Sequence, residues 1–312
     1  MKPDDRILIT GAQGLVGSAV ANHLRQAGYA NLIEVGRDTC DLTDTAATIA
    51  AFERARPDYV FHAAARVYGI MGNLKNKALS FFDNVMINTN VVEASHRVGV
   101  KKIAAMGTGA VYPYPSPGLP LREEMIFLGK PHPAEDSYAQ AKRAMLAMLQ
   151  AYEESYGIEW VYLVSCNLFG PRDKFDTEFG HVVPSLIKKF HDARQDRGKV
   201  TIWGDGSAQR DFLYVKDAAL AICLAMENCH GAVNMGSSQV LRIRDIVDMI
   251  ADITGMADRL VWDASKPNGQ DYRAYDLSKL EAAGFKPAYS IRGGLEETWA
   301  WYCRHTEASQ AR

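Results

Sequence analysis

The first 170 residues alternate short apolar runs with longer amphipathic stretches. A short run rich in β-branched and aromatic residues is typical of a buried strand, and a longer stretch with helical periodicity is typical of a surface helix. Parallel strands need helical crossovers of this kind between them. The pattern therefore predicts an α/β fold with a doubly wound parallel sheet, whose strands are expected at Arg6–Thr10, Asn31–Val35, Tyr59–His62, Lys102–Met106 and Trp160–Val164.

After Pro171 this alternation loosens. Lys174–Gly180 is polar and loop-like, whereas Asp211–Met235 is typical of a return to the sheet. We therefore expect residues 1–170 with 211–235 to form one domain, and residues 171–210 with 236–312 to form a smaller α/β domain. The elements expected in the smaller domain are helices at Val183–Ala193, Arg242–Thr254 and Ser290–Tyr302, a strand at Val200–Trp203, and a frayed polar tail at Arg304–Arg312.

Composition narrows the functional classes. The chain has 312 residues, of which 47% are hydrophobic and 23% charged, and its formal net charge is −2. Such a balance lacks the basic field that gathers nucleic acid or anionic membranes, so neither partner is expected. The five cysteines show no Cys-x-x-Cys spacing, which argues against disulfides and a metal site. Without a signal-peptide pattern or an apolar run of about 18 residues, the sequence predicts a cytoplasmic protein.

Glycines directly follow the first predicted strand, in the run Thr10–Gly17. A glycine-rich turn between a strand and a helix lets the backbone bend tightly and lets a pyrophosphate approach the helix N-terminus. The spacing here is Gly-x-x-Gly-x-x-Gly, one residue longer in its first gap than Gly-x-Gly-x-x-Gly. We expect a dinucleotide at this turn, bound by Gly11, Gln13, Gly14, Leu15, Val16 and Gly17.

The end of the second predicted strand bears on the choice of nicotinamide cofactor. Glu34 offers an acid for a ribose hydroxyl, and Arg37 offers a cation for a 2′-phosphate. Arg37 favours NADP, while NAD stays an alternative because an arginine here is also consistent with an ordinary surface cation. Asp41 and Leu42, just beyond, are expected near the adenine.

Tyr138 and Lys142 form a Tyr-x-x-x-Lys pair near the start of a predicted helix, so both side chains lie on one face. An unperturbed tyrosine pKa near 10 is too high for efficient proton exchange at neutral pH, and a neighbouring ammonium is expected to lower it. Thr108 follows the fourth strand, at the carboxyl end where open parallel sheets bind ligands. Its hydroxyl can donate to a carbonyl oxygen, so these three residues are the predicted catalytic set.

Together these motifs resemble the extended short-chain dehydrogenase/reductases, and within them the GDP-L-fucose synthases. Further segments agree with the family in order along nearly the whole chain: Ala63–Ile70, Val111–Pro113, Asn167–Pro171, His181–Pro184, Lys189–His191, Trp203–Gly206, Arg210–Leu213 and Lys266–Gly269. The resemblance implies an enzyme that uses NADPH to reduce a nucleotide-linked 4-keto-deoxy sugar, with GDP as the expected nucleotide. It also implies a homodimer, built on the helices expected at Leu79–Val98 and Tyr138–Tyr156.

Carried over position by position, the resemblance implies roles for matching residues. Tyr138 would donate the proton, Lys142 would stabilise the phenolate and bond the nicotinamide ribose, and Thr108 would orient the carbonyl in place of the family's serine. The remaining implied contacts are Asn167 in the sugar pocket, Lys189, Trp203, Arg210 and Arg273 at the nucleotide diphosphate, and Ala64 and His181 at the cofactor, with His181 also catalytic.

The chain departs from the family at Ala110, where the GDP-L-fucose synthases have a cysteine that works with a histidine to epimerise C3 and C5. An alanine methyl cannot exchange a proton, so we expect reduction with epimerisation lost or altered, even though His181 is present. One alternative is a nucleotide-sugar 4-epimerase or 4-dehydrogenase with tightly bound NAD. Another is a non-catalytic protein that kept the fold. The exact sugar stays open.

Overall fold

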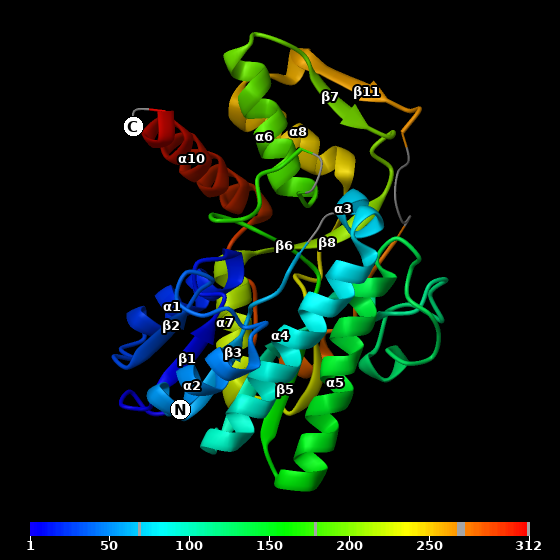
Figure 1. Ribbon diagram of the computed structural model, residues 1–312. Coiled ribbons are helices and arrows are strands. Elements are labelled where there is room, and N and C mark those ends of the chain that lie inside the picture. The colour runs from blue at the N-terminus through cyan, green and yellow to red at the C-terminus, as the bar shows by residue number, and fades with distance from the viewer. Residues whose placement is uncertain (68–69, 178–179, 267–271, 311–312) are drawn as a thin grey trace.

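A six-stranded sheet forms the centre of the larger part of the molecule (Figure 1). The computed structural model describes residues 1–67, 70–177, 180–266 and 272–310. All neighbouring strands of this sheet are parallel, which confirms the predicted fold class. The order across the sheet is β2 (Leu32–Val35), β1 (Ile7–Thr10), β3 (Tyr59–His62), β4 (Lys102–Met106), β5 (Glu159–Ser165) and β9 (Gly231–Met235).

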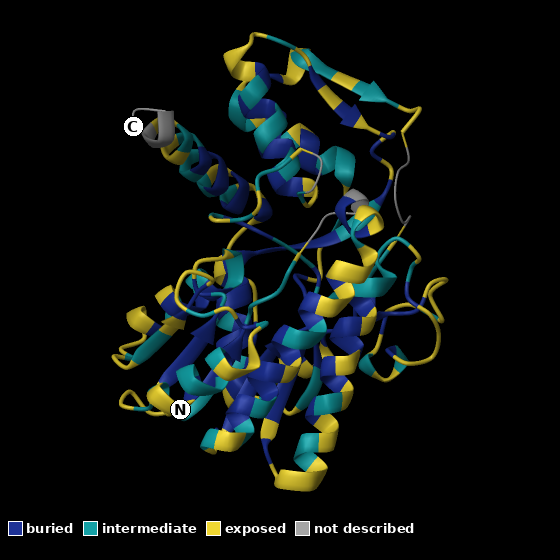
Figure 2. Ribbon diagram, viewed as in Figure 1, coloured by how far each residue is buried: buried dark blue, intermediate teal, exposed yellow. Residues whose placement is uncertain are grey.

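Helices cover both faces of this sheet, and its central strands are accordingly buried over most of their length and largely apolar. On one face α1 packs against α7, and on the other α4 packs against both α2 and α5 (Figures 1 and 2). We call this sheet and its helices the large-sheet region. The bounds of the helices are α1 (Leu15–Gln26), α2 (Thr45–Ala55), α4 (Lys77–Val98), α5 (Asp136–Tyr156) and α7 (Val215–Asn228), with the short helices α3 (Ile70–Lys75), η1 (Gly109–Val111), η2 (Glu123–Met125) and α9 (Ser278–Ala282).

A second group of elements lies beyond the carboxyl ends of β1 and β3 to β5 and forms the small-sheet region (Figure 1). It contains a three-stranded sheet in the order β10 (Val240–Arg242), β8 (Gln209–Tyr214) and β6 (Asn167–Phe169), and a pair of parallel strands, β7 (Val200–Trp203) and β11 (Leu260–Asp263). Its helices are α6 (Val182–Gln195), α8 (Ile243–Thr254), η3 (Ala257–Arg259) and α10 (Ile291–Gln310).

Each region has its own hydrophobic core, and the cores cross the predicted domain boundaries in two places. Residues 211–214 belong to β8 of the three-stranded sheet, and they divide between the two cores: Leu213 packs in the larger core, whereas Phe212 and Tyr214 pack in the smaller one. Conversely, Leu277, Leu280 and Phe285 pack in the larger core rather than in the smaller one. Both differences arise because apolar residues in short segments do not reveal which of two neighbouring cores they will join.

Two further expectations need comment. The predicted frayed tail is wrong up to Gln310, because α10 continues past Tyr302 and its Thr306 bonds the carbonyl oxygen of Tyr302 at 3.0 Å. Parts of the family-like segments Ala63–Ile70 and Lys266–Gly269 lie outside the described residues. None of the helices in the described ranges combines the length and the apolar character that a membrane span requires.

Candidate active site

The glycine turn joins β1 to α1 through close backbone contacts. Gly11 has a φ of +67°, a conformation that favours glycine. A Cβ on Gly11 would lie 2.9 Å from the Cα and N atoms of Ala64, and a Cβ on Gly17 would collide with the carbonyl oxygen of Gly11. Gly14 has no side chain to cover the N-terminus of α1, and the first turn contains no acidic residue. The residues of this turn therefore fit the pyrophosphate of a dinucleotide.

The edge of the site beyond β2 is polar. The side-chain amide of Gln13 donates to Oδ1 of Asp38 at 2.8 Å, which joins the glycine turn to this edge. Arg37 is exposed beside Asp38. Hydrogen bonds from Thr43 lower the pKa of Asp41, and the positive charge of Arg37 lowers it further. Arg37 and Asp41 thus lie on the same edge, where the sequence predicts the adenosine end of the cofactor.

Behind the glycine turn lies a buried polar chain that the sequence did not suggest. The hydroxyl of Thr10 bonds Nδ1 of His62 at 2.8 Å and accepts a hydrogen bond from the backbone N of Ala64 at 3.2 Å. Nε2 of His62 bonds Oδ1 of Asn88 at 3.0 Å, and Asn88 donates to the carbonyl oxygen of Ala141 at 3.4 Å. Burial lowers the pKa of His62 to about 3, so its ring is neutral and serves as a connector.

The predicted catalytic residues meet at the carboxyl end of β4. Nζ of Lys142 donates to the carbonyl oxygen of Met106, the last residue of β4, at 2.8 Å. The hydroxyl of Thr108, two residues further on, accepts a hydrogen bond from the backbone N of Ala110 at 3.3 Å. Nζ of Lys142 also lies 5.9 Å from the centroid of the Tyr138 ring. A threonine hydroxyl that accepts one hydrogen bond can still donate its proton, so this contact leaves the Thr108 hydroxyl able to donate to a ligand.

Burial controls the acidity of the Tyr138 and Lys142 pair. Lys142 is 1% exposed, and burial lowers its pKa to about 7. Burial also raises the pKa of the Tyr138 phenol, and the negative charge of Glu135 raises it further. The expected lowering of the Tyr138 pKa is therefore wrong for the protein by itself. The reason is that burial penalises the charged phenolate more than any nearby cation favours it, and the charge of Glu135 acts in the same direction.

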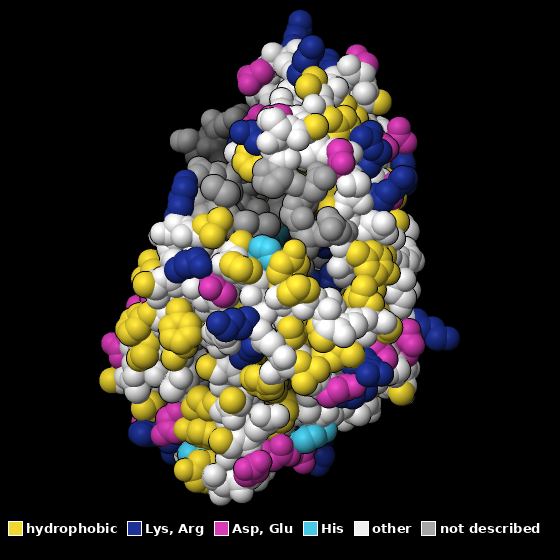
Figure 3. Space-filling view, turned by 90° about the vertical axis from the view of Figure 1, so that its right-hand side faces the viewer, with side chains coloured by type: hydrophobic (Ala, Val, Ile, Leu, Met, Phe, Trp, Pro, Cys, Tyr) yellow, Lys and Arg dark blue, Asp and Glu magenta, His cyan; other side chains and the backbone are white. Residues whose placement is uncertain are grey.

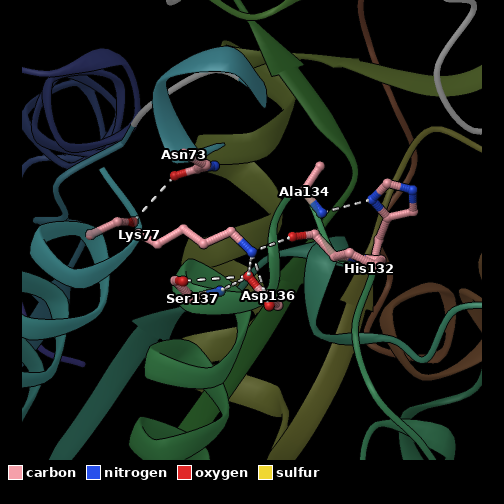
Figure 4. A network of polar contacts seen from close by, with 8 residues as sticks. Asn73, Lys77, His132, Ala134, Asp136 and Ser137 are labelled. Atoms are coloured by element: carbon pink, nitrogen blue, oxygen red, sulfur yellow. Dashed lines mark hydrogen bonds and ion pairs between the residues drawn. The ribbon is translucent and has the colours of Figure 1, made fainter. Parts of the chain in front are cut away.

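A surface network holds the chain where α5 begins (Figure 4). Nζ of Lys77, at the start of α4, donates to the carbonyl oxygen of Pro133 at 2.9 Å and pairs with the carboxylate of Asp136 at 3.1 Å. The same carboxylate accepts a hydrogen bond from the backbone N of Ser137 at 2.8 Å. The first turn of α5 is thereby fixed to α4, and Tyr138 lies in that turn.

His181 is exposed at the N-cap of α6, and its acidic neighbour is a residue that the sequence analysis missed. Burial raises the pKa of Asp173, and the nearby His181 opposes this rise by favouring the carboxylate. Oδ1 of Asp173 accepts a hydrogen bond from the backbone N of Lys174 at 2.7 Å. Oδ2 is buried and has no hydrogen-bond partner within the described ranges. An acid eight positions before a histidine forms no recognisable motif, so only the fold could reveal this pair.

Arg273 lies beside the catalytic residues. Its Nη2 is 3.8 Å from Oε2 of Glu135, one helical turn before Tyr138. Its Nη1 is 3.2 Å from the position that a Cβ on Gly109 would occupy. Arg273 thus lies next to η1, while its implied contact with a diphosphate stays a prediction.

The remaining implied nucleotide contacts lie in the small-sheet region. Trp203, at the end of β7, is 45% exposed. Nζ of Lys189 lies 5.1 Å from its ring centroid and donates to the carbonyl oxygen of Thr201 at 3.1 Å. Nζ of Lys266 lies 5.9 Å from the same centroid. An exposed indole between two cations can stack on a base and attract phosphates.

Asn167 and Arg210 lie in the three-stranded sheet between the catalytic residues and Trp203. The amide of Asn167 donates to the carbonyl oxygen of Asp211 at 3.1 Å, so part of its hydrogen-bonding capacity is used within the sheet. Nη1 of Arg210 donates to the carbonyl oxygen of Gln209 at 2.7 Å. Leu42, predicted near the adenine, is buried, and its carbonyl oxygen accepts a hydrogen bond from Asn90 at 2.9 Å.

Comparison with known proteins fits this arrangement. Residues 7–236 match the model of the NAD dependent epimerase/dehydratase family. The chain belongs to this family. It is 36% identical over 301 residues to a probable GDP-L-fucose synthase 1 of Oryza sativa subsp. japonica, an alignment that covers 95% of this chain and 92% of the relative. The resemblance noted in the sequence is thereby confirmed.

Solved structures of the family are similar over the whole fold. A GDP-6-OMe-4-keto-L-xylo-heptose reductase from C. jejuni has a TM-score of 0.91 and 28% identity, with 98% of this chain and 99% of that chain covered. A GDP-mannoheptose C4 reductase from Campylobacter jejuni, solved with NADP bound, has a TM-score of 0.86 and 28% identity, with 97% and 99% covered. Both of these structurally similar enzymes are named as reductases of GDP-linked sugars.

Proposed function

We propose that this protein is an NADPH-dependent reductase of a GDP-linked 4-keto-deoxy sugar. The observation that carries the proposal is that Lys142 bonds the last residue of β4 and lies near the Tyr138 ring, with Thr108 two residues beyond that strand. The glycine turn follows β1 at the same carboxyl edge of the parallel sheet. The names of the relatives support the substrate class, since they are GDP-L-fucose synthases and GDP-heptose reductases. The printed names span hexoses and heptoses, so the sugar skeleton is left to experiment.

The residues present divide the work of reduction. The glycine turn and the N-terminus of α1 would hold the pyrophosphate of NADPH, and Arg37 would meet its 2′-phosphate. When bound, NADPH supplies the hydride for C4 of the sugar. Thr108 donates a hydrogen bond to the C4 oxygen, and Tyr138 gives that oxygen its proton. Lys142 stabilises the phenolate that this proton transfer leaves behind.

Epimerisation by the cysteine and histidine route is not part of this proposal, because the residue at the cysteine position is Ala110. Its side chain is 3% exposed and consists of a methyl group, so it can neither donate nor accept a proton. His181 has Asp173 near it and could exchange a proton at one carbon only. We therefore propose that the enzyme reduces C4 and does not exchange protons at C3 and C5 together.

One assay tests the reductase and its nearest alternative together. Purified protein is incubated with NADPH and GDP-4-keto-6-deoxymannose in deuterated water, and absorbance at 340 nm and deuterium in the product are measured. Stoichiometric NADPH oxidation without deuterium at both C3 and C5 is the expected result. Deuterium at both carbons would refute the interpretation of Ala110. Protein that purifies with bound NAD and turns over a 4-hydroxy sugar without added reductant would instead be a 4-epimerase.

We also propose a homodimer formed through α4 and α5, in a cytoplasmic enzyme. Large apolar side chains are exposed on α4, where Leu79, Phe81 and Phe82 are between 44% and 60% exposed. Figure 3 shows hydrophobic side chains over much of the side of the molecule on which α5 lies. Burying such a surface against a second copy is favourable. Sedimentation should give a dimer, and Phe82→Glu should shift it toward the monomer.

A further inference from the structure

Residues 272–276 form a segment that hydrogen bonds hold next to the predicted catalytic residues. Tyr275 pairs with Leu121 in an isolated parallel bridge, and the backbone N of Asp276 donates to the carbonyl oxygen of Leu121 at 2.9 Å. The side chain of Asn234 donates to the carbonyl oxygens of both Leu121 and Asp276, at 2.9 and 3.0 Å. In an extended segment, alternate side chains share a side, so Arg273 and Tyr275 are presented together.

We propose that the hydroxyl of Tyr275, oriented by Arg273, donates a hydrogen bond to the sugar of the bound sugar nucleotide, and that Gly109 is required to admit it. This inference rests on the proposed function, and it assigns a specificity residue that the sequence motifs did not indicate.

The hydroxyl of Tyr275 lies in close contact with Gly109. A Cβ added to Gly109 would collide with the Tyr275 hydroxyl oxygen, and it would lie 3.0 Å from the ring carbon that bears this oxygen. Gly109 has an ordinary negative φ and begins the 3-10 helix η1. Its backbone conformation therefore does not require glycine. Glycine is required because the Tyr275 hydroxyl occupies the space that a side chain at position 109 would fill.

The hydrogen bond between Arg273 and Tyr275 has a defined direction. Arg273 can only donate, so its hydrogen bond with Tyr275 uses the phenol oxygen as the acceptor. The phenol proton is then available for another acceptor. Burial raises the pKa of Tyr275 to about 12, so the phenol keeps this proton at neutral pH. The charge of Arg273 is in turn balanced by Glu135, at 3.8 Å.

The Tyr275 hydroxyl contacts Gly109, which directly follows Thr108. Because the Thr108 hydroxyl is assigned to the C4 oxygen, the Tyr275 hydroxyl lies near the reacting end of the sugar. Of the residues implied at the nucleotide, Lys189 and Trp203 lie in the small-sheet region, on α6 and β7, whereas Arg273, implied at the diphosphate, lies beside Gly109. A donor beside Thr108 therefore meets hydroxyl or ring oxygens of a sugar, not the base.

Binding of two ligands separates a sugar contact from a general structural role. Isothermal titration would measure the affinities of GDP and of GDP-mannose, which lacks the reactive carbonyl, for the wild type and for Tyr275→Phe. We expect GDP-mannose to bind about three- to tenfold more weakly to the variant, as for one lost hydrogen bond, and GDP to bind unchanged. Tyr289→Phe, which removes a hydroxyl from an exposed tyrosine near α7, is the matched control.

Gly109→Ala tests the same contact from the other side. It should weaken GDP-mannose binding in the wild type, because the new methyl displaces the phenol, and should cost much less in the Tyr275→Phe background. Equal weakening of both ligands, or no change for either, would overturn the inference while leaving the proposed function in place. If the wild-type protein binds neither ligand, the proposed function fails and the inference fails with it.

Discussion

The two regions of the molecule present their functional side chains in opposite ways. In the large-sheet region Lys142 is 1% exposed and bonded to Met106, and His62 behind it is fully buried. In the small-sheet region Trp203 is 45% exposed and lies at the end of a two-stranded sheet. In the proposed function, the residues that carry the chemistry are buried, whereas a residue expected to recognise the nucleotide is exposed.

The largest effect should follow from the change that removes the proton donor from the large-sheet region. Tyr138→Phe keeps the ring and loses the phenol proton, so kcat for the 4-keto sugar should fall by about 10²- to 10⁴-fold, with NADPH binding unchanged. Stopped-flow absorbance and NADPH titration measure the two quantities. Tyr289→Phe should retain full activity. A Tyr138→Phe enzyme that is as active as the wild type would end the comparison, because the buried residues would then carry no chemistry.

A second test concerns the cost of burying Lys142. Its folded pKa of about 7 lies below the unfolded value near 10.4, so between these values the unfolded state holds the extra proton. The free energy of unfolding of the wild type should therefore be lowest below pH 7 and should rise as the pH increases through this window. Between pH 7 and pH 9, this single group should raise the free energy of unfolding by roughly 2–3 kcal/mol.

Urea unfolding of wild type and Lys142→Met measures that contribution as a difference. The advantage of Lys142→Met over the wild type should shrink between pH 7 and 9. Lys286→Met, which alters an exposed lysine, should follow the wild type. Parallel pH profiles for wild type and Lys142→Met would show that the lysine is not buried as a costly cation.

A smaller effect is expected for the exposed recognition surface. Trp203→Ala removes an indole that can stack on the base, so KM for the sugar nucleotide should rise roughly tenfold while kcat changes little. Steady-state kinetics with varied sugar nucleotide and saturating NADPH give both values. Loss of kcat without a change in KM would place Trp203 with the chemical residues and blur the contrast between the regions.

The smallest effect concerns the cofactor edge. Arg37 is exposed, so its contact with a 2′-phosphate is screened by solvent. Arg37→Ser should weaken NADPH binding roughly two- to fivefold and leave NADH binding unchanged. Fluorescence titration with both nucleotides measures this. Equal affinities for NADPH before and after the change would favour NAD as the natural cofactor.

The sequence predicted the large-sheet region better than the small-sheet region. The parallel strands, the glycine turn and the Tyr138–Lys142 spacing follow from periodicity and short motifs, which act within a few residues. The direction of the Tyr138 pKa shift could not be predicted, because it depends on how deeply the fold buries the phenol and on how near Glu135 lies to it.

Long-range juxtapositions escaped the sequence analysis for the same reason. Asp173 and His181 meet through a loop, and Tyr275 reaches Gly109 from the other end of the chain. The length of α10 was missed because its last turns are polar, and a polar helix end has no periodic signal that separates it from a frayed tail.

The neutral ring of His62 has a mechanical consequence. It connects the back of the glycine turn to Asn88 on α4, and Asn88 connects it to Ala141, the residue before Lys142. Sliding α4 along α5 would leave a buried imidazole without its partner, which is energetically expensive. A displacement of this helix pair, for example by the binding of a second subunit, would therefore be passed through His62 to Thr10, the residue directly before the glycine turn.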